Sequence, residues 1–488
     1  MNKHMHRIIF NHKRGQMMVV AECATADGKS PGVTRRPARR AGSLIAVLRP
    51  LAFSTLVMLG LVTLVPSMAN AQIVAYRNAP VSQQATVLNA ANGVPLVNIQ
   101  TPSAAGVSHN AYSQFDVQQQ GAILNNARTN TQTQLGGWVQ GNPWLATGTA
   151  RVIVNEVVSS NPSSLNGTVE VAGNSAQVVI ANPAGVTCDG CGFINASRAT
   201  VTTGTPVING GKLEGYRVEG GTVTVQGAGM DASGTSQTDL IARAVKINAG
   251  LWAKDLRVST GANQVDADNA QATPIAASGK EPAPGFAIDV AQLGGMYAGK
   301  IKLVGTEAGV GVRNAGQIGA SAGDVVLTAD GRLVNSGHIE SSGQTRVDNV
   351  AGIDNSGTIY ARNDLALSAR DDIDNRGMIA AQGNATLTAT GAAGRIANRA
   401  DATLAAGLAA DGTLGTTGNL ELTAAQVSTQ GQTLAAGDQT LTARELDLAD
   451  SRISATNVRL TATAGDIDAR RAQITASSAL ADRAARDL

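Results

Sequence analysis

Short runs of alternating apolar and polar residues, separated by glycine and asparagine, fill most of the chain beyond residue 149. Alternation of this kind, rich in β-branched residues, is typical of half-buried strands. It predicts strands at residues 151–155, 168–171, 177–180 and 222–225. Beyond the N-terminal segment, helical spacing is confined to residues 478–488. The pattern therefore predicts an all-β protein.

The clearest signal is a repeat of the form Asn-x-Gly-x-Ile, whose copies follow one another at intervals of 21, 20 and 20 residues. The copies begin at Asn314, Asn335, Asn355, Asn375 and, in degraded form, Asn398. A second alternating strand follows them, as in residues 325–329, 365–369 and 385–389. We expect Asn and Gly to recur because corners between strands need left-handed or tight backbone angles.

A period of this length with short strands indicates a β-solenoid, in which stacked coils bury inward Ile, Leu and Val in one column. The fold class that we predict is a right-handed parallel β-helix, preceded by a long signal peptide. A leucine-rich solenoid is the structural alternative, but its Leu-x-x-Leu-x-Leu framework and helical return are missing. Asp, Pro and Gly crowd into residues 265–285, which predicts a loop extending from the solenoid, with a hinge as the alternative.

Composition supports this fold and argues against one class of partner. Glycine makes up 55 of the 488 residues, aromatic residues only 3%, and charged residues 15% against the usual ~25%. The net charge of +2 combines +8 on residues 1–71 with −6 on the remainder. Because no basic stripe interleaved with aromatic residues follows, we expect no nucleic-acid partner.

An apolar run at residues 51–65 precedes the small-x-small triplet Ala69-Asn70-Ala71. The run is 15 residues long, shorter than the ~20 that a membrane-spanning helix needs. It fits the hydrophobic region of a secretory signal, and the triplet predicts cleavage between Ala71 and Gln72. An uncleaved membrane anchor is the alternative.

Cys188 and Cys191 flank Asp189-Gly190, a strong signal for a two-residue hairpin turn. Residues facing each other across such a turn have Cα atoms about 5.5 Å apart, a separation that suits a disulfide. In an exported protein we expect a structural disulfide. A redox-active pair is the alternative, although no thioredoxin-like pattern surrounds it. Zinc needs further ligands nearby, so we expect no metal site.

Catalytic motifs are missing from the sequence. Residues 227–232 formally fit Gly-x-Gly-x-x-Gly/Ala, but no helix is expected after them. Acidic pairs such as Asp371-Asp372 stand beside repeat corners, where carboxylates are commonly solvated. We expect neither an enzyme nor a cofactor.

Three parts of the chain together resemble known exported proteins. Residues 1–22 resemble the extended signal peptide of very large Gram-negative exported proteins, and residues 134–197 resemble the secretion domain of the filamentous haemagglutinin family. Residues 187–193 are similar to the branch that includes contact-dependent inhibition toxins. The resemblance marks two secretion motifs, composed of Asn142, Pro143, Trp144 and Leu145 and of Asn182, Pro183, Ala184, Gly185 and Val186. Trp144 and Ala184 stand where the family has Asn, so side-chain bonding by that Asn is not carried over.

The resemblance implies three segments: an extended signal peptide at residues 1–71, a secretion domain at 72–310, and haemagglutinin-type repeats at 311–488 that appear truncated. It implies a two-partner-secretion exoprotein, exported through Sec and the periplasm to the surface of a Gram-negative bacterium or beyond. Its partner would be an outer-membrane TpsB-type transporter, with POTRA domains that recognise the secretion domain and a β-barrel.

Three functions are open at this point. The first is a surface or secreted filament that adheres to a host or a neighbouring bacterial cell. The second is the delivery stalk of a contact-dependent growth inhibition toxin, with the C-terminal toxin domain absent here. The third is a β-helix polysaccharide lyase, which needs carboxylates and basic residues converging on one face. For the secretion role, we expect substitution of Asn182 or Pro183 to lower secretion more than stability.

Overall fold

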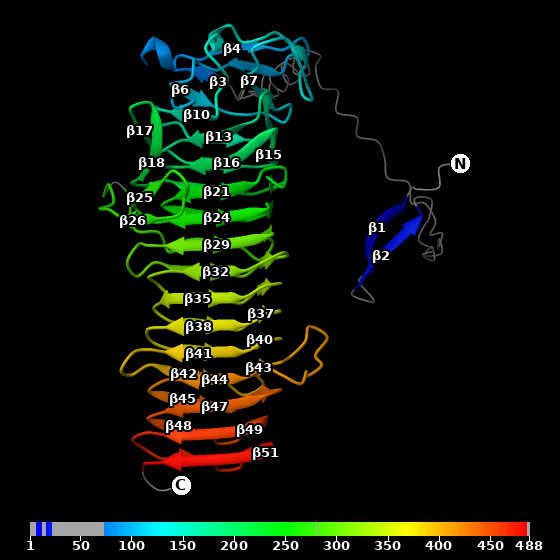
Figure 1. Cartoon of the computed structure of the whole chain (residues 1–488), viewed down its shortest axis with the longest axis vertical. Coiled ribbons are helices and arrows are strands. Elements are labelled where there is room, and N and C mark those ends of the chain that lie inside the picture. Colours follow the sequence, from blue (N-terminus) through cyan, green and yellow to red (C-terminus); the bar gives the residue numbers. More distant parts are fainter. Residues whose placement is uncertain (1–5, 12–15, 22–72, 280, 486–488) are drawn as a thin grey trace, which may run out of the picture. The chain divides into compact units, whose positions relative to one another are not determined.

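The computed structural model describes residues 6–11, 16–21, 73–279 and 281–485 (Figure 1). The chain divides into two compact units, Met1–Ala69 and Asn70–Leu488. The first contains an antiparallel hairpin of β1 (His6–Asn11) and β2 (Gln16–Ala21). The predicted apolar run at residues 51–65 and the cleavage site between Ala71 and Gln72 lie outside the described residues. Among the residues described, no helix has the length and apolar character needed to cross a membrane.

The second unit is a parallel β-helix, as predicted, whose coils build three faces (Figure 1). Near its C-terminal end, the long strand β49 (Arg452–Ala462) spans the second and third faces. The first face contains β11 (Ser163–Leu165), β14 (Val186–Cys188), β19 (Thr222–Val225), β22 (Ala244–Ile247), β27 (Phe286–Val290), β30 (Gly311–Asn314), β33 (Leu333–Asn335), β36 (Ile353–Asn355), β39 (Ile373–Asn375), β42 (Arg395–Asn398), β45 (Gln426–Thr429), β48 (Glu445–Asp447) and β50 (Ile467–Asp468).

The second face contains β7 (Ala122–Asn126), β12 (Thr168–Gly173), β15 (Cys191–Ile194), β20 (Met230–Asp231), β23 (Gly250–Trp252), β28 (Gly295–Ala298), β31 (Gln317–Ala320), β34 (His338–Ser341), β37 (Thr358–Ala361), β40 (Met378–Ala381), β43 (Thr403–Ala406) and β46 (Gln432–Ala435). The third face contains β6 (Val107–Phe115), β10 (Val152–Val157), β13 (Ala176–Ala181), β16 (Ala196–Thr202), β21 (Gln237–Ala242), β24 (Asp255–Thr260), β29 (Lys300–Gly305), β32 (Val325–Thr328), β35 (Thr345–Val350), β38 (Leu365–Ala369), β41 (Ala385–Ala389), β44 (Leu420–Thr423) and β47 (Asp438–Ala443).

Inward side chains of successive coils lie directly above one another. On the first face, Leu333 pairs with Ile353 and Ile353 pairs with Ile373, and all three are fully buried. The same stacking on all faces joins the core into one cluster that runs from Ile73 to Ile467. Because a single coil cannot bury its own apolar edge, stacking closes the core. The predicted aliphatic column is confirmed.

The repeated asparagines do not form corners with left-handed backbone, so that expectation is wrong. None of them has a positive φ; instead their side chains are buried and stack on one another between coils. Asn314 donates to Asn335 at 2.8 Å, Asn335 to Asn355 at 2.7 Å, Asn355 to Asn375 at 2.8 Å and Asn375 to Asn398 at 2.9 Å. The repeat therefore encodes an internal ladder of amide hydrogen bonds.

The glycine of each repeat is also needed for a different reason than the one predicted. Gly337, Gly357 and Gly377 have no positive φ, but a Cβ atom at Gly357 would lie 2.0 Å from the carbonyl oxygen of Gly337. The same approach recurs one coil later, where a Cβ at Gly377 would lie 2.1 Å from the Gly357 oxygen. Glycine is therefore required because adjacent coils touch through their backbones here.

Two further expectations need correction. The described part of residues 478–488 is not helical, because β51 (Gln473–Ala484) pairs in parallel with β49 (Arg452–Ala462). Within residues 265–285, part of the expected loop is ordered as strand: β25 (Asn263–Asp266) and β26 (Ala272–Pro274) pair with each other, and β25 also pairs with β18 (Lys212–Val218). β18 pairs with β17 (Thr205–Asn209) to complete a four-stranded antiparallel sheet outside the helix.

Antiparallel strands close the N-terminal end of the β-helix. β3 (Ile73–Ala75) pairs with β6, and β4 (Thr86–Asn89) pairs with β5 (Pro95–Asn98), which pairs in turn with β7. A hairpin of β8 (Thr131–Thr133) and β9 (Gly137–Val139) follows β7 in the chain. Among the described strands β4 pairs with β5 alone, so one edge of this N-terminal cap is unpaired.

Candidate functional site

The first predicted motif, Asn142 to Leu145, lies in the N-terminal cap, where its residues divide between core and surface. Asn142 is 3% exposed; its amide donates to the carbonyl oxygens of Ile99 and Asn125, both at 2.9 Å. Its side-chain oxygen accepts from the Trp144 backbone N–H at 3.0 Å and so caps the short 3₁₀ helix η2 (Pro143–Leu145). Asn142 and the buried Leu145 therefore hold the turn that presents Trp144 outward.

A cleft of about 520 Å³ adjoins this turn. Trp144 is 45% exposed on one side of it, while Trp138 from β9 is 70% exposed and Leu88 from β4 is 47% exposed. The Trp144 indole N–H donates to the Thr86 hydroxyl at 3.3 Å, which orients the ring along the edge strand β4. The cleft thus combines exposed aromatic rings with an unpaired strand edge.

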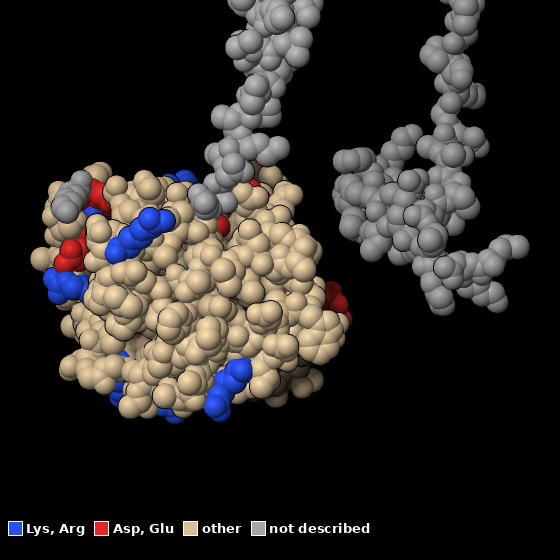
Figure 2. All heavy atoms as spheres, turned by 90° about the horizontal axis from the view of Figure 1, so that it is seen from above, with Lys and Arg blue, Asp and Glu red and all other residues tan. Residues whose placement is uncertain are grey.

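Trp138 and Leu88 lie outside both motifs that the sequence marks. The sequence does contain a signal for Trp138. This tryptophan follows two glycines, which are typical of a turn, in a chain in which aromatic residues make up only 3%. Figure 2 looks onto this end of the unit and shows mostly uncharged residues on its described part. Contacts with a partner at this face would therefore depend little on charge.

The second motif, Asn182 to Val186, repeats the same local arrangement at a corner between β13 and β14. Asn182 is fully buried, and its amide donates to the Asn161 carbonyl at 2.9 Å and to the Ser163 hydroxyl at 3.0 Å. Its side-chain oxygen accepts from the Ala184 backbone N–H at 2.9 Å. Pro183 and Ala184 are exposed, whereas Gly185 and Val186 are buried.

The two motifs occupy different corners. The first is anchored to the backbone beside β5 and β7, the second to the segment leading into β11. In both, the asparagine fastens one turn to a neighbouring segment, and the exposed positions are the proline and the residue after it. Each motif is therefore a buried anchor that supports a small exposed surface.

Cys188 and Cys191 form a disulfide with Cα atoms 5.4 Å apart. The hairpin expected between them is wrong, because β14 and β15 do not pair with each other but belong to the first and second faces. Gly190 has a φ of 85° and supplies the left-handed residue of this corner. The disulfide therefore closes a coil corner directly after the second motif.

Groups that could support other chemistry are few in the described part of the chain. No cluster of three or more His, Cys, Asp and Glu side chains there could hold a metal ion. Beneath the cap, Tyr112 donates its hydroxyl to the Asn155 side chain at 3.0 Å, and full burial raises the pKa of this phenol well above its ordinary value. These polar groups serve the packing of the first coils.

Comparison with known families gives two matches. Residues 71–340 match the family described as the TPS secretion domain, and residues 1–51 match the Extended Signal Peptide of Type V secretion system. The first match covers more than half of the 488 residues and includes both motifs and the disulfide.

Curated proteins and solved structures give further similarities. The chain is 56% identical over 366 residues to "Toxin CdiA" of Yersinia pestis and 51% identical over 352 residues to "tRNA nuclease CdiA-2" of Burkholderia pseudomallei (strain 1026b). These alignments cover 74% and 70% of this chain but 11% of each relative. The crystal structure of the filamentous hemagglutinin secretion domain is 28% identical with a TM-score of 0.45, covering 76% of this chain and 98% of that one.

Proposed function

The chain belongs to the two-partner-secretion exoproteins, the family of the TPS secretion domain, and we propose that its N-terminal cap is the surface bound by an outer-membrane transporter. The extended signal peptide marks the chain for export through Sec, so the cap would meet this partner in the periplasm. The partner we propose is a TpsB-type protein, with POTRA domains that bind the cap and a β-barrel that the chain traverses.

The observation that carries this proposal is a group of large, exposed apolar side chains around the cleft beside the first motif. Trp138, Trp144 and Leu88 leave large apolar surfaces in water around one cleft of about 520 Å³. Clustered exposure of this kind marks interaction sites, and tryptophan is enriched among residues that dominate binding energy. The free edge of β4 adds backbone donors and acceptors to which an extended partner segment can pair.

The β-helix supplies a physical reason why export would proceed in one direction. Each coil pairs with the coils before and after it, so folding can propagate from the cap one coil at a time. A coil that has stacked outside the barrel is too wide to return through it. Stepwise folding on the outer side would therefore bias movement outward without nucleotide hydrolysis.

Once exported, the unit would stand on the cell surface or be released as a rod that adheres to a host or neighbouring cell. The long parallel stack and the mainly aliphatic cluster that runs through it suit such a rod. A second candidate, the delivery stalk of a contact-dependent inhibition toxin, is favoured by the relatives printed as "Toxin CdiA" and "tRNA nuclease CdiA-2". Because the chain spans 11% of those relatives, reading the gene beyond the codon for Leu488 for a continuing frame distinguishes the two.

The test of the transporter role is export of the double variant Trp138→Ala/Trp144→Ala. The chain is expressed together with a TpsB-type transporter, and secreted protein is compared with protein retained in the periplasm. We expect at least a tenfold fall in the secreted fraction, with unchanged thermal stability of purified residues 70–488. Leu293→Ala removes another strongly exposed apolar side chain, 89% exposed on a distant coil, and should export normally. Normal export of the double variant would overturn the proposal.

A further inference from the structure

A line of outward-facing residues runs along the second face of the β-helix, one residue per coil. Strand register places Trp252 against Tyr297, Tyr297 against Gly319, Gly319 against Glu340, and Glu340 against Tyr360. Successive coils lie about 4.8 Å apart, as neighbouring strands do in any sheet. The line therefore places two exposed aromatic residues, a gap, a carboxylate and a third aromatic residue, the buried Tyr360, at regular spacing along the rod.

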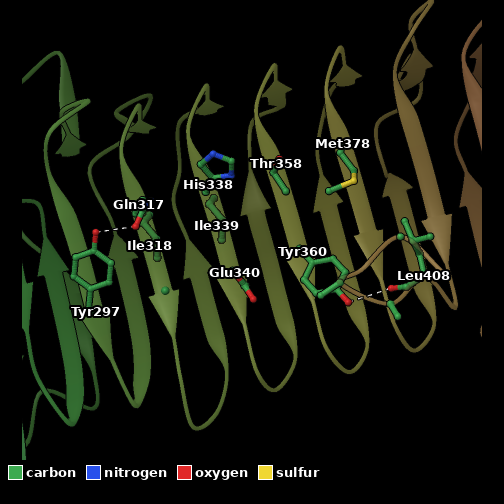
Figure 3. A pocket seen from close by; sticks show the side chains of 14 residues that line it. Tyr297, Gln317, Ile318, His338, Ile339, Glu340, Thr358, Tyr360, Met378 and Leu408 are labelled. Carbon is green, nitrogen blue, oxygen red and sulfur yellow. Dashed lines mark hydrogen bonds between the residues drawn. The ribbon is translucent and has the colours of Figure 1, made fainter. Parts of the chain in front are cut away.

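Two clefts of about 480 and 470 Å³ lie over this line. Both are lined by Tyr297, Gly319 and Glu340, so the two clefts adjoin along the line. Figure 3 shows the first of them, whose lining residues follow one another from coil to coil. Trp252 lines one end, and the loop after β43 closes the other, where the Tyr360 hydroxyl donates to the Leu408 carbonyl at 3.1 Å. We call this feature the axial groove.

The axial groove combines two exposed aromatic rings with hydrogen-bonding side chains. Trp252 and Tyr297 are 44% and 37% exposed, and their rings lie nearly parallel, 18° apart, with centroids separated by 6.1 Å. The Tyr297 hydroxyl donates to Gln317 at 2.7 Å, which fixes the ring at the edge of the cleft. The polar residues beside the rings are Gln317, His338, Glu340 and Thr358, as Figure 3 shows.

Gly319 forms the floor between Tyr297 and Glu340, and the backbone does not require glycine there. A Cβ atom at Gly319 would come no closer than 3.8 Å to any other atom, and its φ is not left-handed. Gly357, in contrast, cannot carry a Cβ without meeting a backbone oxygen at 2.0 Å. The absence of a side chain at Gly319 therefore keeps the groove open rather than allowing the coils to stack.

Charges in the axial groove are balanced. Glu340 forms an ion pair with Arg362 from the next coil at 3.4 Å, and both side chains are about half exposed. The groove therefore offers hydrogen-bond donors and acceptors without a net field that selects a charged polymer. An extended peptide is also disfavoured, because strands β28, β31, β34 and β37 are paired on both sides and leave no free edge for it.

We propose that the axial groove binds a neutral, unbranched oligosaccharide that lies along the rod. The apolar faces of its sugar rings would stack on Tyr297 and Trp252, and its hydroxyls would bond to Gln317, His338 and Glu340. The rise of about 4.8 Å per coil is close to the length of one sugar unit, so successive units can meet equivalent positions. Binding at this groove is separate from export, since it uses a face far along the chain from the N-terminal cap.

The test is binding of purified residues 70–488, which form a compact unit, to a printed panel of oligosaccharides. The panel contains unbranched neutral chains of glucose, galactose, mannose and N-acetylglucosamine with two to eight units, together with acidic glycans and extended peptides. We expect retention on at least one neutral series, with affinity rising up to a length of three or more units. No retention on any neutral chain, or retention on acidic glycans or peptides alone, overturns the proposal.

Variants locate the binding within the protein. Tyr297→Ala and the space-filling Gly319→Val should each weaken the selected oligosaccharide at least tenfold, while thermal unfolding of the variants stays close to that of the parent. Val158→Ala trims an apolar side chain that is 44% exposed outside the groove and should bind as the parent does. Binding that survives both groove variants would overturn the assignment. The binding assay uses purified protein and does not depend on export. A negative binding result therefore says nothing about the transporter role, and a negative export result says nothing about oligosaccharide binding.

Discussion

Asn335 and Asn355 lie one above the other inside the β-helix, and the Asn335 amide donates to the Asn355 side-chain oxygen at 2.7 Å. The Asn335 amide also donates to the Thr358 carbonyl of the next coil at 3.1 Å. Each asparagine of the ladder thus binds its own coil to the one that follows. The ladder begins at Asn314 because the preceding coil places Val290 at that position, which leaves the Asn314 side-chain oxygen without a hydrogen-bond partner in the described part of the chain.

Replacing Asn335 by Ala should destabilise the repeats. The substitution removes a buried amide and leaves the Asn355 oxygen without its donor, at a cost of about 1–3 kcal/mol for an unsatisfied buried group. Urea unfolding of residues 70–488, followed by circular dichroism, measures the loss. Ser336→Ala changes the adjacent exposed position and should leave the midpoint unchanged. Equal midpoints for Asn335→Ala and Ser336→Ala would mean that the ladder adds no stability.

Replacing Gly357 by Ala should destabilise the same region through a steric clash. The new Cβ would lie 2.0 Å from the Gly337 oxygen, and the stacked coils on both sides prevent it from moving away. Forced overpacking of this kind typically costs about 1–3 kcal/mol. Gly285→Ala is the matched control, because its Cβ meets nothing within 4 Å. We expect that variant to be neutral or slightly more stable, and a neutral Gly357→Ala would contradict the close approach of the coils.

Reducing the disulfide should lower stability modestly and leave the corner in place. Cys188 and Cys191 are separated by three positions. Closing so short a loop restricts the unfolded chain and thereby raises the free energy of unfolding by about 2 kcal/mol. Thermal unfolding of residues 70–488 with and without dithiothreitol measures the difference. The variant Cys188→Ala/Cys191→Ala should show no response to the reductant. A loss of the whole fold on reduction would show that the corner depends on the disulfide.

The solenoid and its strands could be predicted because the repeat period and the alternation of apolar residues are local signals. The role of Asn335 and Gly357 could not, since a 20-residue period shows where these residues recur but not whether they face inward or turn a corner. Asp189-Gly190 was misread for a related reason: a tight turn has the same local signature in a hairpin and at a coil corner. The strand content of residues 265–285 was missed because β25 pairs with β18, whose residues lie far earlier in the chain.

The functional sites, like the fold, could be predicted only in part from the sequence. The two motifs could be located by resemblance, but the exposure of Trp138 and Leu88 depends on how the cap folds. The axial groove joins Trp252, Tyr297 and Tyr360, which share no constant spacing because the insertion containing β25 and β26 interrupts the coils. Only the observed register places Trp252 and Tyr297 on adjacent coils.

Asn182 and Ala184 should respond differently to substitution, although both belong to the second motif. Asn182 is fully buried and makes three hydrogen bonds through its side chain, so Asn182→Ala should cost about 1–3 kcal/mol for each group left unsatisfied. Because a fully buried side chain cannot touch a partner, its export should fall in step with its stability, which replaces the expectation from sequence alone that secretion falls further. Ala184 is exposed, so Ala184→Glu should change stability by less than about 0.5 kcal/mol.

If the transporter binds the exposed part of this motif, Ala184→Glu should still reduce export, because it places a charge on a surface that the partner must cover. The measurement pairs the secreted fraction with the unfolding midpoint of residues 70–488 for each variant. Ala392→Glu adds the same charge at an exposed position in the repeats and should affect neither quantity. If Ala184→Glu is exported like Ala392→Glu, the motif serves the fold alone, because its buried asparagine would then account for every effect of substitution there.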